Sequence, residues 1–127
     1  METTTNVDPK KMEAFLGHVA FFDCLHDLGD PINALKNCRK MLVSDGTIMA
    51  VEPMAGRKVE ENFNPVGRVY SGASVLCCTP NALATGGYAL GTVATDEELE
   101  TVAREAGFTQ FRRATETPFS RVFEIKI

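Results

Sequence analysis

One histidine and two carboxylates in this sequence have the types and positions expected of an acid–base site. His26 and Asp27 are adjacent in a polar stretch after the apolar run 20–25, and Glu52 follows a second apolar run at 47–51. An imidazole titrates near neutral pH, so it is well suited to take a proton from a hydroxyl group, and a carboxylate can orient it. We predict His26, Asp27 and Glu52 as catalytic residues. The structural alternative is that His26 and Asp27 only cap the following helix and bind loop amides.

The remaining potential metal ligands and nucleophiles form no recognised motif. Asp23 and Asp30 flank His26 and Asp27, but this spacing matches no known ligand pattern, and solvated capping is favoured. The four cysteines have no CxxC spacing: Cys24, Cys38, Cys77 and Cys78. We therefore predict no metal site and a cytoplasmic protein with reduced, mostly buried thiols.

Length and charge limit the classes of function. The chain has 127 residues, which suits a single domain, and 13 Lys and Arg against 17 Asp and Glu give a net charge of -4. An acidic balance argues against a nucleic-acid surface, which needs clustered basic residues. No apolar run reaches the ~20 residues of a membrane span, and no signal-peptide pattern is visible at the start. We expect neither nucleic acid nor membrane as a partner.

Strands and helices alternate around the predicted site. The run 20–25 suits a buried strand, Asp30 and Pro31 begin a helix, and 46–52 suits a second strand. A strand, a helix and a strand joined by short links predict parallel pairing with a right-handed crossover. His26 and Glu52 would then lie together, because the carboxyl ends of adjacent parallel strands meet at one edge of the sheet.

Three further helices are predicted by caps and apolar spacing. Asp8 and Pro9 begin a helix over 7–19. We predict residues 1–19 as an N-terminal helical segment and residues 20–127 as a separate domain of α/β type. A second helix covers 68–78. Its inward side chains would be Val69, Ala73, Leu76 and Cys77.

The third helix has the clearest signals. Thr95 and Glu98 form a capping box that opens a helix through Ala106, with Gly107 as its C-cap. Residues 81–93 contain three glycines and are predicted to form an irregular loop.

The C-terminal stretch predicts a hairpin. Residues 108–115 and 119–127 alternate apolar and polar side chains around a Pro-containing turn. Val122, Ile125 and Ile127 do not share one face. We therefore expect the last strand to be covered on both sides and to lie inside the sheet.

An ordered set of short motifs carries a family resemblance. The set begins with Phe22-Asp23-Cys24-Leu25-His26-Asp27-Leu28-Gly29-Asp30-Pro31, Ala34-Leu35 and Cys38-Arg39-Lys40-Met41-Leu42, and continues with Asp45-Gly46-Thr47, Val51-Glu52-Pro53, Ala106-Gly107-Phe108 and the terminal hairpin. Over residues 20–127 it resembles the second half of class I S-adenosylmethionine-dependent methyltransferases. Bacterial enzymes that carry a winged-helix domain and resemble small-molecule O-methyltransferases are the most similar group.

The resemblance implies an α/β fold with a partial Rossmann-like methyltransferase sheet. Its four strands would have the order 20–25, 46–52, 119–127, 108–115, with only 119–127 antiparallel and with helices packed on the sheet. The resemblance also implies that His26 and Asp27 match the pair where many O-methyltransferases place a general base. Glu52 matches an acidic position that can orient that base.

The sequence departs from this family in its cofactor site. Such enzymes hold S-adenosylmethionine with a glycine-rich turn after the first strand and an acidic residue that ends the second. No such turn precedes residue 20, and the glycine cluster 86–91 follows a predicted helix and loop. We therefore expect that this chain alone binds no cofactor. Residues 7–19 faintly resemble the leading helix of the family's N-terminal domain.

If this chain forms only half of the methyltransferase sheet, the strand 20–25 lacks the neighbour that it has in the full sheet. An unpaired apolar edge favours pairing with another chain. We predict a homodimer, through this edge or through an exposed apolar sheet face. The first hypothesis is a truncated methyltransferase-like domain that acts as an oligomeric binding or interaction module. The alternative is an enzyme: either a methyltransferase completed by a partner chain, or a repurposed pocket that uses His26, Asp27 and Cys24.

Overall fold

A four-stranded mixed sheet forms the base of the molecule. The computed structural model describes residues 16–127, in which the strands are β1 (Leu16–Phe22), β2 (Leu42–Pro53), β3 (Gln110–Glu116) and β4 (Ser120–Lys126). Their order is β1-β2-β4-β3; β1 and β2 are parallel, and β4 is antiparallel to both of its neighbours. The predicted fold class, strand order and single antiparallel strand are confirmed.

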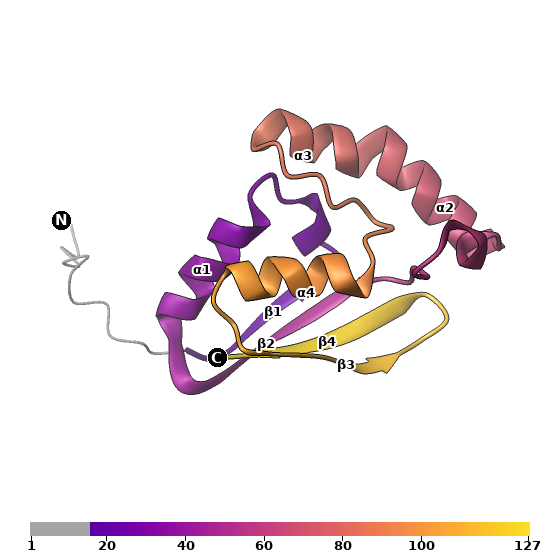
Figure 1. Ribbon diagram of the computed structural model, residues 1–127. Helices are drawn as coiled ribbons and strands as arrows, with labels where there is room; N and C mark the ends of the chain where they lie inside the picture. The colour runs from indigo at the N-terminus through magenta and orange to yellow at the C-terminus, as the bar shows by residue number, and fades with distance from the viewer. Residues whose placement is uncertain (1–15) are drawn as a thin grey trace, which may run out of the picture.

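Two helices cover one face of this sheet. α1 (Pro31–Met41) and α4 (Asp96–Glu105) lie side by side above the strands (Figure 1). Both start as predicted: Asp30 accepts a hydrogen bond from the Asn33 amide at 2.9 Å, and Thr95 and Glu98 form the capping box. Between helices and sheet lies a continuous apolar core, which includes Leu25, Leu35, Ile48, Ala50, Leu99, Val102, Phe108, Phe123 and Ile125.

Within residues 16–127, the opposite face of the sheet carries no helix (Figure 1). Buried and part-exposed residues alternate along β4: Arg121, Phe123 and Ile125 are buried, whereas Val122 and Glu124 on the other face are half-buried. The expectation that the last strand is covered on both sides is therefore wrong. Its interior position is nevertheless confirmed, because β4 lies between β2 and β3.

A helical arm extends beyond the sheet. It consists of α2 (Pro65–Ala73), the π-helical turn η4 (Ser74–Cys78) and α3 (Thr79–Thr85), and it follows a short 3-10 turn, η3 (Val59–Asn62) (Figure 1). Part of the stretch predicted as an irregular loop is thus helical. A loop begins only at Gly86.

The buried side of the arm differs from the predicted one. Val69, Leu76 and Cys77 are exposed, and the buried positions are small residues: Gly67, Ser74, Cys78 and Ala82. The π-helical turn has more residues than an α-helical turn. The residues that face inward therefore change position relative to the regular α-helical spacing. Small side chains also let the arm pack closely against the chain beneath it. Spacing of large apolar residues therefore indicated the wrong face.

The boundaries of the first two strands also differ from the prediction. Leu16–Val19, expected to end a helix, belong to β1, which begins before residue 20 and ends at Phe22. The rest of the predicted N-terminal helix lies outside the described residues. β2 begins already at Leu42, before the predicted start at residue 46, although residues 43–46 pair with neither neighbouring strand.

A buried arginine joins α4 to the sheet. Arg121 is 1% exposed and donates hydrogen bonds to the carbonyl oxygens of Pro53 and Ala94 and to the Asp96 carboxylate at 2.7 Å. Asp96 also accepts from Arg113. Although burial disfavours the Asp96 carboxylate, the hydrogen bonds from both arginines lower its pKa. The sequence analysis did not identify this network. No helix among residues 16–127 has the length and apolarity of a membrane span.

Candidate functional site

A sharp change of chain direction after β1 positions His26. Asp23 adopts a positive φ of 47°, a conformation that aspartate tolerates better than most residues, and its amide donates to the Val51 carbonyl at 2.8 Å. The chain then enters the 3-10 turn η2 (Leu25–Asp27), in which Leu25 and His26 are buried. Leu25 belongs to the core and so anchors the turn. The histidine next to it is thereby held at the end of the sheet.

Glu52 approaches His26 from the carboxyl end of β2. The Nδ1 atom of His26 and Oε2 of Glu52 are 2.5 Å apart, and Oε1 accepts a hydrogen bond from the Leu25 amide at 3.0 Å. His26 is 3% exposed and Glu52 is 1% exposed. Because the carboxylate only accepts, Nδ1 carries the proton, and Nε2 of the neutral ring keeps a free lone pair. The structure thus brings together the two residues that the sequence predicted to be neighbours.

Two opposing effects act on the His26 imidazole. Burial disfavours the charged ring, but the hydrogen bond and negative charge of Glu52, together with the charges of Asp27 and Asp23, favour it more strongly. The result is a pKa of His26 above its usual value of 6.5. A histidine with such a carboxylate partner is suited to accept a proton near neutral pH. Its role as a general base stays a prediction.

Asp27 lies on the other side of the imidazole. Its Oδ1 is 3.3 Å from Nε2 of His26, and this oxygen is buried without a hydrogen-bond partner among the described residues. The Asp27 side chain as a whole is 40% exposed. Asp27 therefore presents a carboxylate oxygen toward the same space as the free imidazole nitrogen.

Cys78 is the site residue that the sequence analysis missed. His26, Asp27 and Cys78 each place one potential ligand atom within 4.8 Å of the others. Burial and the neighbouring Asp27 carboxylate raise the pKa of the Cys78 thiol to about 12. The sequence held no signal for this group, because 50 residues separate Cys78 from its partners.

Contacts between the helical arm and the loop after η2 bring Cys78 to this position. The Asn81 side-chain amide donates to the Asp27 carbonyl at 3.3 Å. Gly29 and Gly86 lie so close that a Cβ atom on Gly29 would come within 2.5 Å of the Gly86 nitrogen. Only glycine allows this approach of the two backbones. The arm is consequently fixed over the turn that carries His26.

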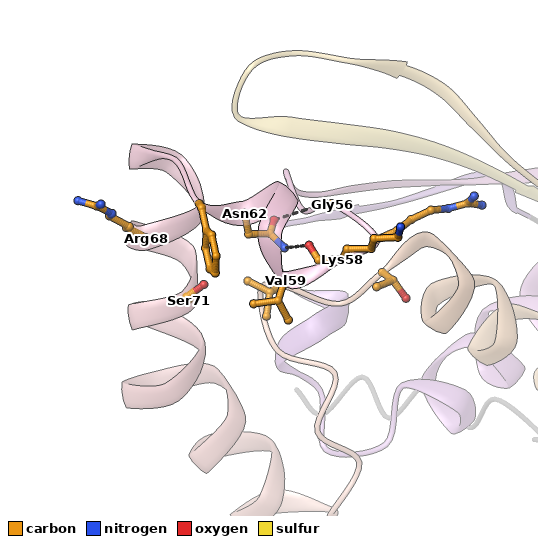
Figure 2. Close-up of a pocket in the computed structure, with 10 residues that line it drawn as sticks. Gly56, Lys58, Val59, Asn62, Arg68 and Ser71 are labelled. Atoms are coloured by element: carbon orange, nitrogen blue, oxygen red, sulfur yellow. Dashed lines mark hydrogen bonds between the residues drawn. The ribbon is translucent and has the colours of Figure 1, made fainter.

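A hollow in the described part of the chain lies away from these residues. It has a volume of about 550 Å³ and is formed by η3, the start of α2 and residues 93–95. Figure 2 shows Val59 facing the hollow, Arg68 pointing away from it, and the Asn62 side chain joining Gly56 to the Lys58 carbonyl. None of the predicted site residues lines it.

Comparisons with known proteins identify the fold. No protein-family model and no curated protein matches this sequence. Among solved structures, the chain is similar to the CMeT domain of the citrinin polyketide synthase, with a TM-score of 0.62 and 14% identity over 94% of this chain and 29% of that one. It has a methyltransferase-like fold.

Two complexes extend the likeness. Human N-acetylserotonin methyltransferase in complex with SAM matches with a TM-score of 0.59 and 18% identity over 87% of this chain and 29% of that chain. An O-methyltransferase from neocarzinostatin biosynthesis, in complex with S-adenosyl-L-homocysteine and 1,4-dihydroxy-2-naphthoic acid, matches with a TM-score of 0.60 and 21% identity over 87% and 29% of the two chains. The chain thus spans less than a third of the length of these methyltransferases.

Proposed function

We propose that this chain supplies the proton-accepting part of an O-methyltransferase-like site. The observation that carries the proposal is the buried pair of His26 and Glu52 at the carboxyl ends of the parallel strands β1 and β2. Open α/β sheets place their functional sites at this edge. The methyltransferase-like fold supports a hydroxyl group of a small molecule as the substrate. Nε2 of His26 would accept the hydroxyl proton, and Glu52 would stabilise the resulting imidazolium.

The described residues do not fit S-adenosylmethionine. Its binding in this fold needs a glycine-rich turn directly after a strand, whereas Gly86 and Gly87 follow the helix α3, and Gly86 lies against Gly29. We therefore propose that another polypeptide segment carries the cofactor-binding half and pairs along β1. This strand is at the end of the sheet, and its outer edge is unpaired within residues 16–127. No methyl-transfer step is assigned to this chain alone.

Calorimetric titration with S-adenosylmethionine tests this division of roles. The chain alone should give no binding heat, and tight binding would contradict the proposal. If a complementing polypeptide restores methyl transfer to a small phenol, His26→Ala should reduce the rate by a factor of about 10² to 10⁴, the usual contribution of general-base catalysis. Cys24→Ala is the matched control from the same loop, and it should keep the rate.

A homodimeric interaction module is the second candidate, and the uncovered sheet face favours it. Phe22 is 64% exposed at the end of β1, beside Val51 of β2 in the parallel ladder. An apolar face of this kind marks an interaction surface. A nucleophilic pocket built on Cys24 is not favoured, because burial raises the pKa of that thiol and so disfavours the reactive thiolate.

A further inference from the structure

We propose that His26, Asp27 and Cys78 form a binding site for a divalent transition metal of the zinc class. The ligand atoms are Nε2 of His26, Oδ1 of Asp27 and the Cys78 sulfur. Nitrogen, oxygen and sulfur donors of these three kinds are the usual ligands of Zn²⁺. The proposal does not depend on the methyltransferase-like function, because metal binding is measured without any substrate.

The distances between the donors suit a tetrahedral ion. Bond lengths of about 2.0 to 2.3 Å place neighbouring tetrahedral ligands roughly 3.3 to 3.8 Å apart. His26 Nε2 and Asp27 Oδ1 are already 3.3 Å apart, and no pair among the three donors exceeds 4.8 Å. The two donors that lie farthest apart therefore need to approach each other by only roughly 1 Å to reach tetrahedral geometry. Three protein ligands would leave a fourth position open.

The surroundings of the three donors also fit a metal site. Histidines that bind a metal through one nitrogen commonly donate the other N–H to a carboxylate, which fixes the ring. The contact between His26 Nδ1 and Glu52 Oε2 has this arrangement. Independently, Asp27 Oδ1 is buried and has no hydrogen-bond partner within residues 16–127, and a bound cation would satisfy it. The partial exposure of the Asp27 side chain gives an ion access.

A metal here would join two parts of the fold. His26 and Asp27 belong to η2 next to the sheet, whereas Cys78 ends the π-helical turn of the arm. Binding must displace the thiol proton of Cys78 and compete with protonation of His26, so affinity should fall as the pH decreases. The ion would also occupy the Nε2 lone pair, so the metal-bound form cannot use His26 as a base.

Titration of the full chain with Co²⁺ tests the site directly. Tetrahedral Co²⁺ bound to a thiolate gives an intense ligand-to-metal absorption band, and we expect this band to saturate at one equivalent. Cys78→Ser should abolish it. Cys77→Ser is the matched control, because Cys77 is the adjacent but exposed cysteine, and this variant should keep the band.

Two further measurements separate the loss of a metal ligand from the loss of folding. Glu52→Gln should retain the band with an affinity lower by about 10- to 100-fold, the usual effect of losing a partner of a metal-bound histidine. Zn²⁺ should raise the melting temperature of the wild type and of C77S but not of C78S, with circular dichroism confirming that each variant folds. No band in the wild type, or an unchanged band in C78S, would overturn the proposal.

Discussion

Among single residues, Glu52 has the greatest influence on the predicted site. Both of its oxygens are used, one by His26 and one by the Leu25 amide, and the carboxylate is almost completely buried. It therefore fixes the position of η2 and the state of the imidazole at the same time. Burial alone would lower the pKa of His26, and Glu52 contributes most among the groups that raise it, ahead of the charges of Asp27 and Asp23.

Replacing Glu52 by Gln should lower the pKa of His26. The glutamine keeps the shape of the side chain but removes its charge, so the desolvation of the imidazole is no longer offset. NMR titration of the ring with a chelator present measures this pKa, and His18→Ala assigns the two histidine signals. An unchanged pKa in E52Q would show that Glu52 does not control the imidazole.

The free energy of unfolding should also depend on the protonation of His26. The folded-state pKa of His26 is raised above its unfolded value, so the protonated ring contributes stability that is fully present below the unfolded pKa. This contribution is lost as the pH rises through the folded pKa. Urea unfolding should therefore show the largest stability difference between wild type and E52Q under mildly acidic conditions.

At the level of elements, caps predicted the helices of the core, whereas apolar spacing failed for the arm. Asp30 and Thr95 act within a few residues of their own helices, so their effect is visible in the sequence. The arm contains a π-helical turn and packs through small residues. Its orientation is set by contacts at Gly29 and Asp27, far away along the chain.

Thr95→Ala should destabilise the protein by about 1 kcal/mol, the usual cost of losing a helix N-cap. The hydroxyl accepts a hydrogen bond from the Glu98 amide, and alanine leaves this amide without its side-chain partner. Urea denaturation measures the change. Thr95→Ser keeps the hydroxyl and should stay near the wild-type midpoint; equal midpoints for T95A and wild type would rule out the capping contribution.

At the scale of the whole molecule, residues 16–127 cover one face of the sheet and leave the other uncovered. Helices α1 and α4 bury one side (Figure 1). The other side exposes Phe22 next to the partly exposed Val51 and Val122. The matched methyltransferases are about three times as long as this chain, because 94% and 87% of this chain align with 29% of theirs. Association with another chain would remove this apolar surface from water.

Phe22→Lys should weaken a homodimer formed through this face. A charge at the centre of an apolar interface has to be desolvated, so the dimer fraction measured by light scattering at a given concentration should fall. Phe63→Lys is the control, since Phe63 is 73% exposed but lies beside η3, away from the sheet. A wild-type monomer at high concentration, or equal effects of F22K and F63K, would contradict the homodimer.

The sequence by itself determined the α/β class, the parallel pairing of the first two strands and the meeting of His26 with Glu52, whereas the order of the four strands was implied by its resemblance to methyltransferases. The first three features follow from local caps, from alternating strands and helices, and from the rule that parallel strands bring their carboxyl ends together. Only the tertiary structure decided which side of the arm is buried, that β4 has one covered face, and that Cys78 lies beside Asp27. The physical reason is that packing between segments far apart in the chain depends on side-chain size and backbone contact, and periodicity within one segment does not encode either.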